Sequence, residues 1–127
     1  MRGDDSTLIV EDNEMNARLL MHQLRHLGLD DLTHFSDARD ALAWLRGRTC
    51  RLILTDWQMH PMGGAEFVRQ VRRYENGAPA RSLIIAVTAG AMPSDYERCM
   101  EAGVDDYLTK PLGLAALSEV LRKWKIL

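Results

Sequence analysis

Three acidic residues stand where the chain leaves short apolar segments. Glu11 and Asp12 follow residues 8–10, and Asp56 follows residues 52–55. Carboxylates that lie close together raise each other's pKa and destabilise a fold, unless a metal ion or an ammonium group offsets their charge. Packing does not need such a cluster, so we interpret these residues as a candidate chemical site.

The types of these residues favour a hard cation. Mg²⁺ takes oxygen ligands, keeps several water molecules and is usually bound by one or two protein carboxylates together with a phosphate oxygen. Asp12 and Asp56 suit that role, and Glu11 would hold a metal-bound water. The sequence therefore predicts a divalent metal site that includes Asp56.

Two further polar residues suit phosphate chemistry. Thr88 follows the apolar residues 83–87, and Lys110 comes shortly after residues 106–108. A carboxylate such as Asp56 can attack phosphorus and form an acyl phosphate, whose oxygens then need compensating charge. Lys110, the Thr88 hydroxyl and the metal would supply that compensation, and the metal should be obligatory because the acidic residues otherwise repel a phosphoryl group.

Five short segments are predicted to be strands, near residues 7–10, 32–34, 52–55, 83–87 and 106–108. The apolar ones show no alternation, as is typical of strands that helices cover on both faces. Segments with the apolar spacing of helices separate them, which predicts an α/β fold with a doubly wound, five-stranded parallel sheet. Ligands bind such sheets at the carboxyl ends of the strands, so the polar candidates should meet at one edge.

Signals for helix ends support this order of elements. Gly28, Gly47 and Gly103 stand where helices should stop. Residues 94–97, Ser-Asp-Tyr-Glu, follow Pro93 and match a capping box that would open the fourth helix.

Composition limits the class of protein. A length of 127 residues suits a single globular domain, and a net charge of −2 gives no broad attraction to nucleic acid or to anionic lipid. No apolar run approaches the length of a membrane span, and no signal peptide is evident. We expect a cytoplasmic location, with Cys50 and Cys99 as packing residues.

Four motifs together resemble one known family. Residues 10–13 (Val-Glu-Asp-Asn), Asp56, Thr88 and the pair Lys110-Pro111 follow successive predicted strands, and they look like the receiver domain of two-component response regulators. The resemblance covers essentially the whole chain. It implies a single receiver domain over residues 1–127 with the flavodoxin-like strand order 2-1-3-4-5 and five helices.

The resemblance also implies a role for each acidic residue. Asp56 would accept a phosphoryl group from a histidine of a kinase or of a histidine phosphotransfer protein. Mg²⁺, or Mn²⁺ in its place, would be bound by Asp12, Asp56 and the main-chain carbonyl of Gln58, with Glu11 acting through water.

A second set of roles concerns the switch. Thr88 and Tyr107 match the family's switch pair, in which the hydroxyl moves toward the phosphate and the ring turns inward. The fourth helix, fifth strand and fifth helix would form the face that partners read. The Lys110-Pro111 bond is commonly cis in the family, a geometry that is accessible mainly before proline.

Residues 10–20 and 107–112 are most similar to receivers fused to bacterial sensor kinases, the hybrid kinases of the virulence-sensor type. Such a receiver passes its phosphoryl group to a phosphotransfer domain, and this chain would then be an excised part of a histidine kinase. The domain itself would carry out phosphotransfer and autodephosphorylation, as a monomer or weak dimer without direct contact to nucleic acid or membrane. A stand-alone, single-domain regulator remains an alternative.

One segment departs from the family pattern. Where the family usually has Asp-x-x-Met-Pro-x-Met-Asp-Gly, residues 56–64 read Asp-Trp-Gln-Met-His-Pro-Met-Gly-Gly. The proline is displaced by one position to Pro61, and Gly63 replaces an aspartate. We expect an atypical or mobile loop before the third helix.

Three other functions fit the same architecture less well. A receiver-like binding module without phosphorylation would not need the intact acidic, hydroxyl and lysine set. A flavin-nucleotide carrier would need a phosphate-binding loop after the first strand, where Glu11 and Asp12 would repel phosphate. An aspartyl-phosphate hydrolase would want Asp-x-Asp after the nucleophile, but Gln58 occupies that place.

Overall fold

The computed structural model describes residues 6–76, 81–90 and 92–127. Its centre is one sheet of five parallel strands in the order β2-β1-β3-β4-β5. The strands are β1 (Thr7–Val10), β2 (Leu32–Phe35), β3 (Leu52–Asp56), β4 (Leu83–Thr88) and β5 (Asp106–Thr109). The fold class and the strand order are as predicted, and β2 to β5 each continue one residue beyond their predicted carboxyl ends.

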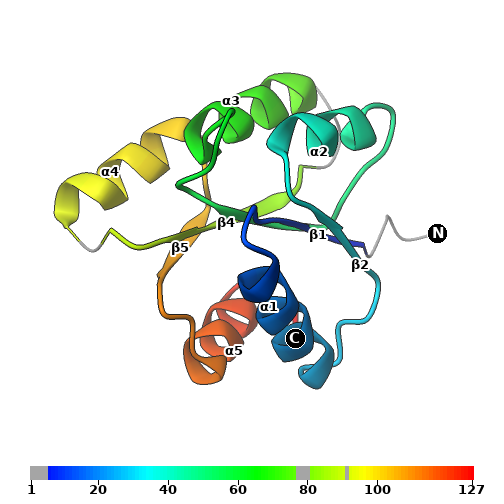
Figure 1. Cartoon of the computed structure of the whole chain (residues 1–127), viewed down its shortest axis with the longest axis vertical. Coiled ribbons are helices and arrows are strands. Elements are labelled where there is room, and N and C mark those ends of the chain that lie inside the picture. Colours follow the sequence, from blue (N-terminus) through cyan, green and yellow to red (C-terminus); the bar gives the residue numbers. More distant parts are fainter. Residues whose placement is uncertain (1–5, 77–80, 91) are drawn as a thin grey trace.

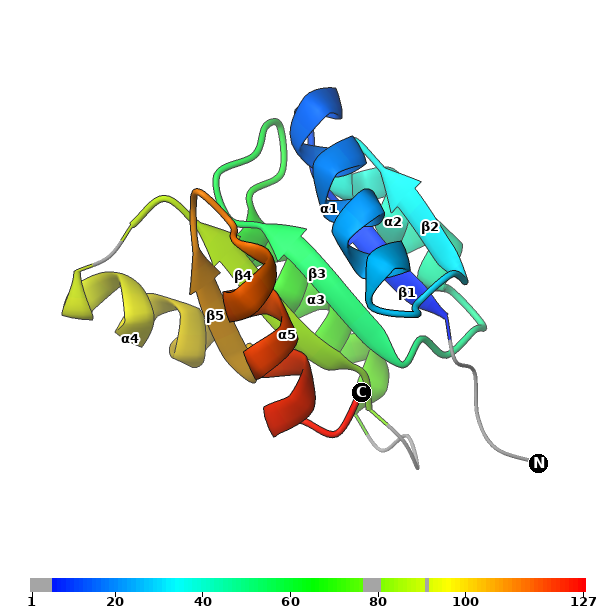
Figure 2. The same cartoon turned by 90° about the horizontal axis from the view of Figure 1, so that it is seen from below.

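Helices cover both faces of the sheet (Figure 1). They are α1 (Glu14–His26), α2 (Ala38–Leu45), α3 (Gly64–Glu75), α4 (Pro93–Ala102) and α5 (Leu114–Lys123). Figure 1 shows α2, α3 and α4 on one face and α1 and α5 on the other, and Figure 2 views the sheet from the side of α1 and α5. Within the described ranges, no helix is long and apolar enough to cross a bilayer.

The hydrophobic core has one half on each face of the sheet. Ile53 belongs to the half under α2, α3 and α4 together with Phe67, whereas its neighbour Leu54 belongs to the other half together with Leu24. All four side chains are fully buried. Successive side chains of a strand point to opposite faces, so a strand between two helical layers needs apolar residues at every position.

The predicted helix ends are correct at three glycines and wrong at one cap. Gly28, Gly47 and Gly103 have positive φ angles of 94°, 73° and 115°, which suit glycine after a helix. Helix α4, however, begins at Pro93 with Met92 as its N-cap, and Asp95 accepts a hydrogen bond from the Met92 main-chain N–H at 3.0 Å. The helix therefore starts before the predicted capping box, because proline favours the first helical position, where no N–H is needed.

The register of the strands brings their carboxyl ends level. Val10 pairs with Thr55, Asp56 pairs with Val87, and Thr88 pairs with Thr109. The residues that end or follow β1, β3, β4 and β5 consequently gather at one edge of the sheet, where the predicted site residues lie.

Candidate functional site

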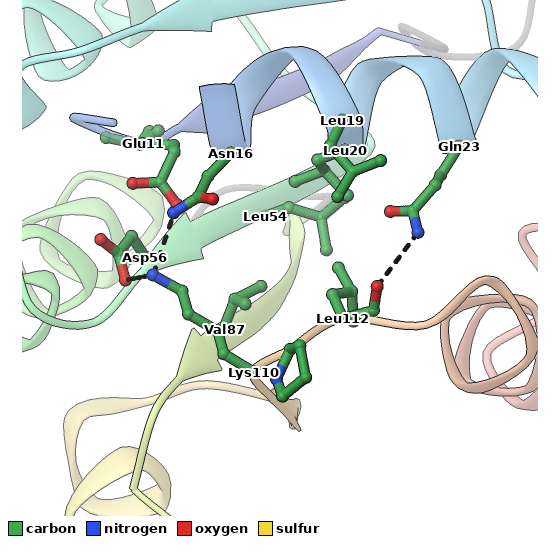
Figure 3. Close-up of a pocket in the computed structure, with 12 residues that line it drawn as sticks. Glu11, Asn16, Leu19, Leu20, Gln23, Leu54, Asp56, Val87, Lys110 and Leu112 are labelled. Atoms are coloured by element: carbon green, nitrogen blue, oxygen red, sulfur yellow. Dashed lines mark hydrogen bonds and ion pairs between the residues drawn. The ribbon is translucent and has the colours of Figure 1, made fainter. Parts of the chain in front are cut away.

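An ammonium group lies between two buried carboxylates at this edge (Figure 3). Lys110 Nζ donates to Asp56 Oδ1 at 2.9 Å and lies 3.5 Å from Glu11 Oε1. Asp56 is 4% exposed and Glu11 is 6% exposed. The Lys110 main-chain N–H donates to the Thr88 carbonyl at 2.8 Å, and the bond to Pro111 is cis, as predicted. The fold thus aims the lysine at Asp56.

The third carboxylate completes an acidic cluster. Oxygen atoms of Glu11, Asp12 and Asp56 lie within 4.8 Å of one another, and Asp12 is exposed. Three carboxylates face one ammonium group, so a compensating positive charge is still needed when all are ionised. All three candidate ligands are carboxylate oxygens, and that of Asp12 is accessible to solvent. Such ligands fit a hard cation that keeps part of its water, such as Mg²⁺.

Burial is the largest cause of an unusual pKa in the cluster. It raises the pKa of Glu11 from 4.5 to about 7; the Asn13 main-chain N–H and the Lys110 ammonium oppose this increase, and the Asp56 charge adds to it. Burial lowers the pKa of Lys110, but its hydrogen bond and charge interaction with Asp56 outweigh burial, so the net pKa is raised. Lys110 therefore stays charged while Glu11 titrates near neutral pH.

This titration predicts a pH dependence of stability. Because the folded-state pKa of Glu11 lies above the unfolded value, the folded state binds more protons between about pH 4.5 and 7, and this group's contribution to stability falls as pH rises through that window. In EDTA, thermal unfolding should show a lower midpoint near pH 8 than near pH 5. Added Mg²⁺ should raise the midpoint more near pH 8, since a metal ion favours ionised ligands.

The matched variants for that measurement are Glu11→Gln and Glu14→Gln. Glu11→Gln should flatten the pH dependence, whereas Glu14→Gln should leave it unchanged because the Glu14 side chain is 75% exposed. An unchanged profile in Glu11→Gln would show that another group causes the dependence.

The Thr88 hydroxyl is held by two donors. Gln58 Nε2 and the Gly90 main-chain N–H each donate to Thr88 Oγ1 at 3.0 Å, and Thr88 is 1% exposed. A hydroxyl oxygen has two lone pairs, so both are engaged and its remaining capacity is to donate its own proton. The sequence predicted a role only for the main-chain carbonyl of Gln58, so this side-chain contact was not expected.

Two other supporting contacts were also missed. Asn13 caps α1 by accepting from the Asn16 N–H at 3.0 Å, and its own main-chain N–H donates to Glu11 Oε2 at 3.0 Å. His34 lies 2.8 Å from the Glu11 carbonyl through Nε2, and a carbonyl only accepts, so this nitrogen carries the proton. His34 lies in β2, within the segment that was predicted to be a strand, and it is half-buried. The pairing of β1 with β2 was the available signal for its contact with Glu11.

The first residue of α3, which directly follows the loop from β3, has a definite reason to be a glycine. A Cβ at Gly64 would lie 2.7 Å from the Asp56 carbonyl oxygen, and the Gly64 N–H donates to the Trp57 carbonyl at 3.0 Å. The His60-Pro61 bond is cis. A side chain at position 64 would clash with the main chain of Asp56, so glycine is required there because of space. The conformational freedom of glycine is not the reason.

Tyr107 lies in β5, which is an edge strand of the sheet. Its ring is half-buried and stacks at a tilt on Tyr96 of α4, with centroids 5.1 Å apart. This contact links the strand that carries Tyr107 to the exposed surface of α4.

Comparison with known proteins decides the family. Residues 7–122 match the sequence profile of the response regulator receiver domain. The chain belongs to the response regulator receiver family. The receiver is 36% identical over 118 residues to hybrid signal transduction histidine kinase G of Dictyostelium discoideum, covering 92% of this chain and 3% of that protein. It is 35% identical over 120 residues to the virulence sensor protein BvgS of Bordetella pertussis, covering 91% of this chain and 10% of that protein.

Solved receiver structures agree with this assignment. The receiver domain of sensor histidine kinase PA1611 from Pseudomonas aeruginosa, which holds a magnesium ion in its active-site cleft, has a TM-score of 0.82 and 36% identity, covering 95% of this chain and 97% of that chain. The Ssk1 receiver of Saccharomyces cerevisiae, in complex with the histidine phosphotransfer protein Ypd1, has a TM-score of 0.85 and 32% identity, covering 98% and 90%. These findings confirm the predicted similarity to receivers of phosphorelays and hybrid kinases.

The receiver spans only a small part of its curated relatives, between 3% and 12% of their length. Those relatives come from bacteria and from Dictyostelium. Activities and partners of whole hybrid kinases are consequently proposals for this chain.

Proposed function

We propose that Asp56 accepts a phosphoryl group from a phosphohistidine. A carboxylate oxygen of Asp56 forms a bond to phosphorus while the phosphorus–nitrogen bond breaks, and the histidine nitrogen keeps the electron pair. The supporting observation is the buried Asp56 carboxylate with Lys110 Nζ at 2.9 Å. The Lys110 ammonium group can stabilise the negative charge that develops on the phosphoryl oxygens during transfer.

We further propose that Asp12, Asp56 and the main-chain carbonyl of Gln58 hold Mg²⁺, or Mn²⁺ in its place, with Glu11 acting through water. When bound, the ion neutralises the negative charge that phosphoryl transfer brings to the site. The carboxylate cluster and the magnesium ion in the PA1611 receiver support this assignment.

Thr88 and Tyr107 are proposed as the switch. The Thr88 hydroxyl has its proton available for a phosphoryl oxygen, because both lone pairs already accept hydrogen bonds. Tyr107 packs at a tilt on Tyr96 of α4, and both Met92, the N-cap of that helix, and Met100 within it are exposed. A change in the position of Tyr107 would therefore alter the face formed by α4, β5 and α5.

Gln58 provides a testable link to Thr88. Gln58→Met keeps the length of the side chain but removes the donor, so the Thr88 hydroxyl loses its fixed orientation. We expect labelling by acetyl phosphate with Mg²⁺ to slow by about threefold to tenfold. In a Thr88→Val background the same substitution should have little effect, and an equal effect in both backgrounds would show that Gln58 acts independently of Thr88.

The relatives support a proposal for the parent protein and its partners. We propose that the whole chain is one receiver domain, excised from a hybrid sensor histidine kinase of bacterial type, and that it lies in the cytoplasm. Its partner would be a histidine kinase or histidine phosphotransfer protein, as Ypd1 is for the Ssk1 receiver. It would act as a monomer or weak dimer, and a stand-alone regulator is the alternative.

Helix α1 offers the partner an apolar surface beside Asp56. Met15 is 81% exposed and Leu19 is 53% exposed, and their spacing places both on one side of the helix. Leu19 lines the same pocket as Asp56. We propose that a phosphotransfer protein docks here.

Met15→Glu tests this docking surface. Transfer from a phosphorylated histidine phosphotransfer protein that reacts with the parent domain should slow by about tenfold or more, because a charge replaces an apolar contact. Labelling by acetyl phosphate, which needs no docking, should change by less than about twofold. Tyr74→Glu, at an exposed position of α3 on the other face of the sheet, is the control, and equal effects of the two variants would contradict the assignment.

The decisive experiment for the function is labelling with a small phosphodonor. The chain is incubated with acetyl phosphate and Mg²⁺, and intact mass is measured before and after treatment with hydroxylamine, which cleaves acyl phosphates. One added phosphoryl group that needs Mg²⁺ and is lost in hydroxylamine would support phosphoacceptor function. No added mass under these conditions would instead support a receiver-like binding module without phosphorylation.

A further inference from the structure

A pocket of about 380 Å³ lies between α1 and the segment that follows β5 (Figure 3). Asp56 and Lys110 line one end of this pocket, and Gln23 lines the other end. Between these ends the lining is mainly apolar: Leu19, Leu20, Leu54, Val87 and Leu112. The volume lies at the lower end of the range for small-molecule sites, which is roughly 300–1,000 Å³.

Gln23 brings an unsatisfied acceptor to this pocket. Its side chain is on the buried face of α1, is 9% exposed, and donates through Nε2 to the Leu112 carbonyl at 3.1 Å. A carbonyl only accepts, so this bond fixes which end of the amide faces Leu112, and Figure 3 shows the oxygen turned toward the leucine side chains. Among the described residues, Gln23 Oε1 is the buried side-chain oxygen or nitrogen that has no hydrogen-bond partner.

The two ends of the pocket differ in what they can offer a ligand. Lys110 already contacts Asp56 and Glu11, and Asp12 adds a further carboxylate nearby, so an anion would be repelled. An apolar lining also disfavours a charged ligand of either sign. Gln23 Oε1, in contrast, requires a donor, because a buried polar atom without a partner is unfavourable.

We propose that this pocket binds an uncharged, ring-sized organic molecule that donates one hydrogen bond to Gln23 Oε1, of the phenol or indole class. The apolar ring lies against the leucines, and the O–H or N–H group satisfies the amide oxygen. This oxygen has almost no exposed surface as it stands, and a small turn of the Gln23 amide about its soft terminal torsion opens it to the pocket. Because Lys110 also lines the pocket, an occupant lies beside the side chain that holds Asp56.

Indole and benzofuran are matched probes for this site, because they share a shape and differ in the N–H donor. The ¹⁵N-labelled full chain is titrated with each compound and followed by NMR. We expect indole to bind about tenfold more tightly than benzofuran, with shifts concentrated at residues 16–23 and 110–112. The titration contains neither Mg²⁺ nor a phosphodonor, so its outcome is independent of the proposed phosphotransfer.

Two variants decide whether Gln23 is the acceptor. Gln23→Leu should reduce the ratio of the two affinities to about one, and Leu19→Trp, at a partly exposed position of the lining, should weaken binding of both probes. The proposal is overturned if neither probe binds the parent chain up to its solubility limit, or if the parent binds both equally. It is also overturned if the preference for indole persists in Gln23→Leu, or if the shifts map elsewhere. Should Gln23→Leu not fold, the affinity ratio in the parent and the Leu19→Trp titration give the answer.

Discussion

Asp56→Asn is expected to abolish phosphoryl uptake. The substitution keeps the size of the side chain and an oxygen that can accept from Lys110 Nζ, but an amide oxygen is a poor nucleophile toward phosphorus. Labelling by acetyl phosphate with Mg²⁺ should fall by at least about a thousandfold, to background. The thermal midpoint should stay equal or rise, because one of three clustered carboxylates is removed.

Asp106→Asn is the matched control for this result. Asp106 is also a partly buried aspartate of the sheet, but it begins β5 at the opposite edge and accepts from Trp124 Nε1 at 2.9 Å. It should label at the rate of the parent chain. If Asp56→Asn labels as well as the parent, the phosphoacceptor is a different residue.

The sequence predicted those parts of the site that depend on strand ends. Asp56, Thr88 and Lys110 each follow an apolar segment, and parallel strands in neighbouring positions align their carboxyl ends, so the register followed from the fold class. The acidic cluster was predictable for the same reason. The apolar segments that form strands can be recognised along the whole sequence. An error of one residue at the end of a strand does not change the edge of the sheet at which its carboxyl end lies.

The sequence did not predict contacts that depend on side-chain direction. The Gln58–Thr88 hydrogen bond joins a loop residue to a strand end 30 positions away, and many rotamers of a glutamine are compatible with the same sequence. The burial of the Gln23 amide was also not predicted, because a polar residue in an amphipathic helix is expected to face water. The start of α4 was misplaced because two local preferences compete there, and proline at the first helical position prevailed over the Ser94 cap.

Lys110→Met should reduce both the rate of phosphoryl uptake and stability. Methionine keeps the apolar length of the chain but removes the only ammonium that contacts both Asp56 and Glu11 among the described residues. Loss of one charged group that stabilises the transferred phosphoryl oxygens should slow labelling by about a hundredfold. The remaining buried carboxylates lose their partner, which should cost about 1–3 kcal/mol of unfolding free energy, less than a fully buried pair because the lysine side chain is 27% exposed.

The pH dependence of the lost stability distinguishes Lys110 from an ordinary surface lysine. Lys110 opposes the raised pKa of Glu11, so its removal raises that pKa further, and the loss of stability should be larger near pH 8 than near pH 5. Lys123→Met is the control, since Lys123 Nζ lies 3.1 Å from Asp106 Oδ2 with its side chain 65% exposed, and solvent screens such a pair. Denaturant unfolding at both pH values measures the difference. A destabilisation that is equal at both pH values would show that Lys110 stabilises the fold by packing alone, without charge compensation at Asp56 and Glu11.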